Sequence, residues 1–200
     1  MSGCGCEFEI KDKSQSRVLK QLLLINAVMF LLEISTGWMA QSSALIADSL
    51  DMLADAMVYA TGLYAVGRMP ASKQRAAKVS GVLQISLGLL VIVDVLRRFF
   101  SGSDPDSMLM ILVAILALIA NLICLKLLSQ HRDGEVHMRA SWIFSKNDVI
   151  ANIGIIISGV LVYLTASPII DLIIGFAIAL LVIRGGLLIL ADVKMEQAKC

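Results

Sequence analysis

Long apolar stretches separated by short polar segments recur along the whole 200-residue chain. Each stretch is about 20 residues long, which is the length that a helix needs to cross the roughly 30 Å hydrocarbon layer of a membrane. A strand of a membrane β-barrel shows instead about ten residues of alternating polarity. The pattern predicts an all-α fold, a polytopic membrane protein whose six transmembrane helices form a bundle. The expected spans are Leu19–Met39, Ala44–Val66, Val79–Phe99, Met108–Leu128, Trp142–Leu164 and Pro168–Ala191.

Composition agrees with a membrane protein and excludes several other classes. Apolar residues make up 58% of the chain and charged residues 16%, whereas soluble domains average about 25% charged residues. The mean hydropathy is +0.84, so lipid must cover part of the apolar surface. The net charge of +1 provides no basic field for a polynucleotide, which argues against nucleic acid as a partner.

Lysine and arginine are distributed asymmetrically between the two sides of a six-span arrangement. Thirteen of these cations fall on the side that carries both chain ends, and Arg97 and Arg98 fall on the other. Cytoplasmic loops of membrane proteins carry the excess of Lys and Arg. We therefore expect a multi-pass protein of the bacterial inner (plasma) membrane with both termini in the cytoplasm.

The spans divide the chain into three parts. Residues 1–17 are expected to form a cytoplasmic tail that contains Cys4-Gly-Cys6, residues 18–191 the transmembrane domain, and residues 192–200 a short cytoplasmic tail. Cytoplasmic thiols stay reduced, so no structural disulfide is expected. Cys4 and Cys6 either capture a soft metal or belong to a mobile tail, and the same alternative holds for His131 and His137 in a cytoplasmic loop.

Five acidic residues fall inside the predicted spans: Glu33, Asp48, Asp51, Asp55 and Asp148. An ionised side chain at mid-bilayer costs about 2.5–3.5 kcal/mol on insertion scales. No comparable set of Lys or Arg lies in the spans to neutralise these acids, which points to a cation. Two further acids, Asp94 and Asp171, lie near span ends, where headgroup water can solvate them, and we expect a structural role for both.

The spacing of the acids favours a divalent metal ion. Asp51 and Asp55 are four residues apart, so both carboxylates point to one side of the second span, on which Asp48 also lies. Asp148 comes from the fifth span, and a divalent ion needs about four oxygen, nitrogen or sulfur ligands. The alternative is that these acids are protonated and serve as hydrogen-bonded packing residues.

The segment from Ser43 to Asp55, Ser-Ala-Leu-Ile-Ala-Asp-Ser-Leu-Asp-Met-Leu-Ala-Asp, resembles the second-span signature of the cation diffusion facilitator family. Asp148 falls on the aspartate of the family's fifth-span His-x-x-x-Asp motif. Further matches extend over nearly the whole chain: Asn26, Phe30, Glu33, Gly37, Asn121 and Arg139-Ala-Ser-Trp142.

The resemblance implies a divalent-metal/proton antiporter in which Asp51, Asp55 and Asp148 are ligands of the transported ion. Its partners would then be divalent cations, protons, the lipid bilayer and a second copy in a homodimer. The metal is expected as a substrate, Zn²⁺ or a similar ion such as Co²⁺, Cd²⁺, Fe²⁺ or Mn²⁺, and no resident cofactor is expected. We also expect a short form that lacks the family's C-terminal cytoplasmic domain.

The position of the family's fifth-span histidine is Phe144 in this chain, so the usual fourth ligand is missing. Candidate substitutes are Asn152, Asn147, Ser145 and water. Asn152 is favoured over Asn147 because it lies four residues from Asp148 and shares its helix face. An oxygen-only site favours Mn²⁺, Fe²⁺ or Co²⁺ more than a site with imidazole does, although carboxylates also bind Zn²⁺.

Two other functions are possible for such a chain, and the second of them uses the same acids. One is a membrane subunit that senses metal through the Cys-Gly-Cys segment without transporting it. The other is a metal-dependent intramembrane enzyme, which would need a nucleophile or general base beside the metal. The chain contains no His-Glu-x-x-His motif and no nucleotide-binding motif. A transporter driven by a proton gradient is therefore expected, and not an enzyme.

Overall fold

The computed structural model describes residues 4–65, 70–129 and 136–197, and nearly all of them lie in helices. The helices in these ranges are α1 (Cys4–Met39), α2 (Ser43–Ala65), α3 (Pro70–Ser101), α4 (Ser107–Ser129), α5 (Val136–Thr165) and α6 (Ile169–Gln197). The prediction of an all-α, polytopic membrane bundle is confirmed.

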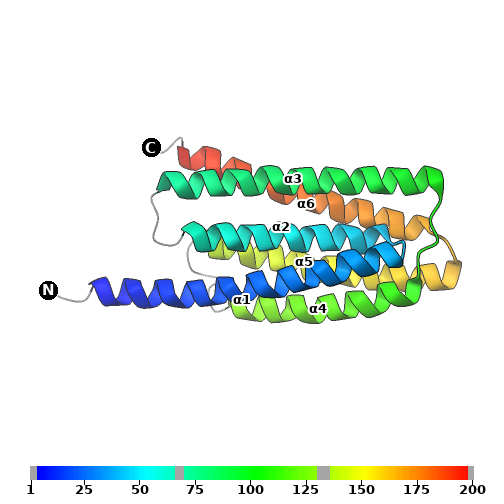
Figure 1. The fold of residues 1–200 in the computed structure, drawn as a ribbon, viewed down its shortest axis with the longest axis horizontal. Helices are drawn as coiled ribbons and strands as arrows, with labels where there is room; N and C mark the ends of the chain where they lie inside the picture. The colour runs from blue at the N-terminus through cyan, green and yellow to red at the C-terminus, as the bar shows by residue number, and fades with distance from the viewer. Residues whose placement is uncertain (1–3, 66–69, 130–135, 198–200) are drawn as a thin grey trace.

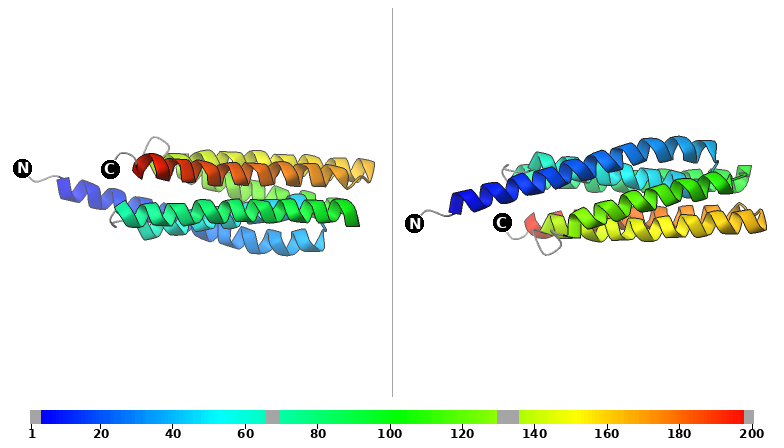
Figure 2. Two further views of the ribbon diagram at one scale, coloured as in Figure 1. Left: turned by 90° about the horizontal axis from the view of Figure 1, so that it is seen from above. Right: turned by 90° about the horizontal axis from the view of Figure 1, so that it is seen from below.

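The bundle has two layers of three helices (Figures 1 and 2). One layer contains α1, α2 and α3, and the other contains α4, α5 and α6. The layers meet where α3 contacts α6, α1 contacts α4, and α2 contacts both α5 and α6. Successive helices run in opposite directions, so α1 begins and α6 ends at the same end of the bundle (Figure 1).

Five of the described helices contain a segment long and apolar enough to cross a membrane, and α2 does not. Its three aspartates lower its hydropathy, although its 23 residues equal those of α4 and span about 35 Å. Protein encloses α2, which contacts four other helices, and every residue from Ser42 to Ser49 is buried. The helix that carries three aspartates in its first turns is thus the one that packs among four neighbours, which shield those turns from lipid.

The segment before the first span, expected to be a cytoplasmic tail, is helical from Cys4 onward. Helix α1 begins at Cys4 and runs without a break into the apolar part, Ser16–Met39, and its first turns project beyond the other helices (Figure 1). Glu, Lys, Gln and Arg in this segment are good helix formers, so the helix continues past the apolar run. The side chains of Cys4 and Cys6 lie outside the described residues, and so do those of His131 and His137.

The N-terminus of α2 is held by residues from two parts of the chain. Ser42 caps the helix, since its Oγ accepts a hydrogen bond from the amide of Leu45 at 3.1 Å. Asp171, in the first turn of α6, accepts hydrogen bonds from the amides of Ser43 at 2.6 Å and Ala44 at 3.2 Å. The hydroxyl of Ser42 also donates to Asp171 at 2.6 Å. The first three amides of α2 therefore all have acceptors.

A glycine in α6 permits this close contact. A Cβ at Gly175 would lie 2.9 Å from the carbonyl carbon of Ser43 and 3.0 Å from the nitrogen of Ala44. Gly175 lies one turn after Asp171, on the same face of α6. The two backbones can therefore approach closely enough for the Asp171 carboxylate to reach the amides of α2.

We expect Gly175→Ala to lower the free energy of unfolding by about 1–3 kcal/mol, because the added methyl group meets backbone that must shift. Thermal unfolding in detergent measures the effect. The matched control is Gly154→Ala, where the nearest atom to the new Cβ would be the Ile174 Cγ2 at 3.9 Å, an ordinary contact. Equal stability of the two variants would show that α2 and α6 are not held this close together.

Candidate metal site

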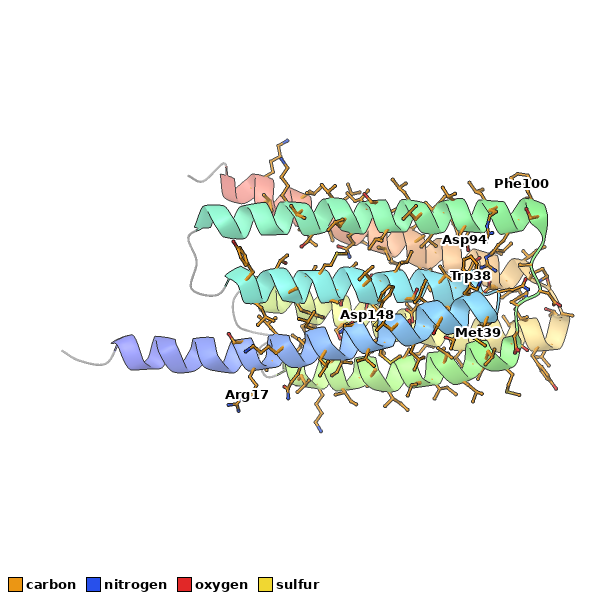
Figure 3. The ribbon with its side chains drawn as sticks, in the orientation of Figure 1. Arg17, Trp38, Met39, Asp94, Phe100 and Asp148 are labelled. Atoms are coloured by element: carbon orange, nitrogen blue, oxygen red, sulfur yellow. The ribbon has the colours of Figure 1, made fainter. Side chains whose placement is uncertain are left out.

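The acids predicted from the sequence lie inside the bundle. Asp48, Asp55 and Asp148 are buried, and Asp51 is half-buried. Figure 3 shows Asp148 at about mid-length of the bundle, far from Asp94 near one end and Arg17 towards the other. The position fits an intramembrane site.

No cation neutralises these acids within the described ranges. Arg98 is the one Lys or Arg among the buried side chains there, and its Nε donates to the Asp94 carboxylate at 2.7 Å. Arg97 reaches the other oxygen of Asp94, also at 2.7 Å. The buried guanidinium is thus already paired with an acid near the end of the bundle, and it is not available to the central acids.

A small cavity brings three of the predicted site residues together. Its volume is about 20 Å³, enough for one water molecule or one ion, and α2, α3, α5 and α6 enclose it. The lining residues are Asp51, Asp55, Gln84, Asn147, Asp148, Ala151 and Leu181. Two helices of each layer therefore contribute to one polar cavity.

One of the three carboxylates in the cavity lies beside each of the other two. Asp148 neighbours both Asp51 and Asp55, and the hydroxyl of Tyr59 donates to Asp55 at 3.0 Å. In the part of the chain that the structure describes, no three His, Cys, Asp or Glu side chains meet closely enough to hold a metal ion. Binding of one ion by all three acids therefore requires the side chains to move inward.

The two asparagines that the sequence offers as a fourth ligand have different surroundings. Asn147 lines the cavity, whereas Asn152, the favoured candidate, is fully buried and is not among the lining residues. The Nδ2 of Asn152 donates to the backbone oxygen of Asp148 at 2.8 Å. Phe144 lies in α5, one turn before Asp148, but its side chain is outside the described residues.

Gln84 is a lining residue that sequence reasoning missed. It comes from the middle of α3, it is buried, and its Oε1 has no hydrogen-bond partner among the described residues. A polar amide in the middle of a predicted span is the signal that could have identified it. Its oxygen is a further neutral ligand within reach of the cavity.

Comparison with known proteins identifies a family. Residues 19–194 match the cation efflux transmembrane domain. The chain is 27% identical to the metal cation efflux system protein CzcD of Cupriavidus metallidurans, over 84% of this chain and 57% of that protein. It is 26% identical to the zinc transporter ZitB of Yersinia pseudotuberculosis, over 86% of this chain and 60% of that protein.

A yeast protein gives a shorter match of higher identity. The chain is 33% identical to the vacuolar zinc transporter ZRC1 of Saccharomyces cerevisiae, over 58% of this chain and 29% of that protein. The chain thus spans less than two thirds of the length of each of these relatives. The domain match covers most of the chain and includes the cavity residues, which confirms the resemblance found in the sequence. The chain belongs to the cation efflux family, the cation diffusion facilitators.

Proposed function

We propose that this protein is a secondary active transporter that exports divalent transition-metal cations, Zn²⁺ or a similar ion, in exchange for protons. The observation that carries the proposal is the cavity between α2, α3, α5 and α6, which Asp51, Asp55 and Asp148 line without a neutralising cation among the described residues. The family and the names of the relatives, a cation efflux protein and zinc transporters, support it.

The ion would be bound by the three carboxylates, with Asn147, Gln84 or water completing the set of about four ligands. A divalent ion offsets two of the three negative charges. The third carboxylate, or all of them when the ion is absent, is then free to take a proton. Because ligands must be deprotonated to bind a metal, protons and metal compete for the same oxygens. This competition couples the two fluxes.

Export would proceed by alternating access, in which part of the bundle rocks against the rest around a fixed site. The cavity lies where the two layers meet, with α2 and α3 on one side and α5 and α6 on the other. A small movement between these helix pairs would open the cavity towards one end of the bundle. The metal is the substrate here, and we propose no resident cofactor.

We further propose a bacterial inner-membrane location with both termini in the cytoplasm. The support comes from the excess of Lys and Arg beside the end of the bundle where α1 begins and α6 ends. In this orientation the cavity loads from the cytoplasm and releases outward, which is export. We also propose that the protein works as a homodimer, as the resemblance implies.

Transport by purified protein in vesicles separates this function from the alternatives. We expect Zn²⁺ or Mn²⁺ to move across the vesicle membrane when a proton gradient is imposed, as followed with a metal-sensitive dye. A metal-sensing subunit or an intramembrane enzyme would bind the ion without moving it. Bound metal without any flux would overturn the proposal.

We expect Phe144→His to shift selectivity towards Zn²⁺. The variant places an imidazole one turn before Asp148, where the family motif carries histidine, and Zn²⁺ gains more from a nitrogen ligand than Mn²⁺ does. The measurement is the ratio of Zn²⁺ to Mn²⁺ flux in the same vesicles, with an expected rise of about tenfold, the lower end of the range for a group that only supports a metal ligand. Phe144→Leu is the control for the loss of the ring. An unchanged ratio in an active variant would show that position 144 does not face the ion.

A further inference from the structure

A second acidic pair lies outside the cavity. Glu33 of α1 and Asp48 of α2 are 0% and 1% exposed, and neither is among the cavity-lining residues. Their carboxyl groups are close neighbours although the helices are different. The pair lies between α1 and α2, whereas the cavity is enclosed by α2, α3, α5 and α6.

The polar atoms of this pair have no protein partner. Within the described residues, all four carboxyl oxygens of Glu33 and Asp48 lack a hydrogen bond. By contrast, Asp55 accepts from Tyr59, and Asp171 from Ser42 and two amides. Buried polar groups are nearly always paired, because burying one without a partner is costly. The four oxygens are therefore available to a cation, or to a proton that the two neighbouring carboxyl groups share.

Asn152 of α5 independently points to the same place. Its side chain is 0% exposed and lies beside Asp48. Its Nδ2 donates one hydrogen to the backbone oxygen of Asp148 and keeps a second hydrogen, and its Oδ1 has no partner among the described residues. The amide thus adds a free oxygen acceptor to a group that already holds two carboxyls. Three helices thus place five oxygen atoms without a partner among the described residues in one region, beside one remaining N–H of the Asn152 amide.

We propose that Glu33, Asp48 and Asn152 form a second binding site for a divalent cation, separate from the site of Asp51, Asp55 and Asp148. Two carboxylates balance the charge of a divalent ion, and the amide oxygen supplies a third ligand. Bidentate carboxylates or water complete the coordination, as is common for hard cations. A set of oxygens alone suits Mn²⁺ or Mg²⁺ better than a thiophilic ion.

The position of the second site gives it a role in export. Asp48 lies two turns before Asp55, about 10 Å along the helix axis, and is nearer the end of the bundle opposite to where α1 begins. An ion that leaves the cavity in the outward direction would meet Glu33 and Asp48 next. The role of Glu33 and Asp48 as an intermediate binding site on the exit path rests on the proposed function. The binding of a cation by these residues does not.

Counting bound ions tests the second site. The probe is Mn²⁺, added to the purified full-length protein in lipid nanodiscs, with bound and free ions separated by electron paramagnetic resonance. We expect two bound ions per wild-type chain and one for the triple variant Asp51→Asn, Asp55→Asn, Asp148→Asn. Adding Glu33→Gln to the triple variant should lower the affinity for the remaining ion at least tenfold. A triple variant that unfolds cooperatively and binds no Mn²⁺ would overturn the proposal.

The reciprocal variant is the matched control. Glu33→Gln with Asp48→Asn keeps the shape of both side chains and removes their charge, so it should bind one ion, at the cavity. Two bound ions in this variant would also overturn the proposal. Failure of metal flux in vesicles, with the stoichiometry as expected, would contradict the transport function and leave the second site intact. The two failures are therefore distinguishable.

Discussion

Asp51→Asn, Asp55→Asn and Asp148→Asn are each expected to reduce metal transport more than about 100-fold. Each change keeps the shape of the side chain and removes a carboxylate that lines the cavity. Loss of a group that only supports a metal ligand costs 10–100-fold in affinity or activity, so loss of a charged ligand should cost more. Initial rates of Zn²⁺ and Mn²⁺ uptake into vesicles under a proton gradient measure the effect.

The matched control for these variants is Asp104→Asn, which makes the same change at an exposed position between α3 and α4. It should transport at the wild-type rate. Loss of an intramembrane charge makes membrane insertion easier, so the amount of protein in the membrane should not fall. Normal flux by any one of the three cavity variants would remove that residue from the proposed ligand set.

Most helix positions could be predicted from the sequence because the hydrocarbon thickness fixes the length of an apolar run. The expected second span begins at Ala44 and α2 begins at Ser43; the expected fourth span begins at Met108 and α4 begins at Ser107. Prediction was poorer on the side of the bundle where the chain ends lie. There α1 extends back to Cys4 through polar residues. These residues favour a helix by their intrinsic propensity, but a hydropathy pattern does not show it.

The acids of the candidate site could also be predicted, because an unpaired charge in a span needs a reason to be there. The neutral residues around them could be predicted only in part, since Asn147 was a candidate but Asn152 was preferred to it. Residues four apart lie on the same face of a helix, so the sequence places Asn152, and not Asn147, on the face of α5 that carries Asp148. The cavity is bounded by α3 and α6 as well, so it includes Asn147, which lies about 100° around the helix from Asp148. Gln84 is found for the same reason: tertiary packing decides which polar residues face the acids.

Asp171 has a structural role, as expected, but it is 0% exposed, so protein groups and not headgroup water surround its carboxylate. Its position near the start of α6 agrees with the sequence, but the turn before α2 covers it. The three hydrogen bonds that it accepts come from residues 127 to 129 positions earlier in the chain. Such a long-range contact leaves no local pattern. The residue links the first turn of α6 to the helix that carries Asp48, Asp51 and Asp55.

Asp171→Ala is therefore expected to lower the free energy of unfolding by about 2–4 kcal/mol. The substitution removes the acceptor of the amides of Ser43 and Ala44, and each buried donor left unpaired costs about 1–3 kcal/mol. It also removes a negative charge from the N-terminus of α2, where the helix dipole favours an anion. Asp171→Asn keeps one oxygen acceptor and should cost about half as much.

Thermal unfolding in detergent, with Asp104→Ala as the exposed control, measures these differences. Because α2 would fray from Ser43 inward, transport should fall in the same order as stability. A stable Asp171→Ala variant would show that another group caps α2.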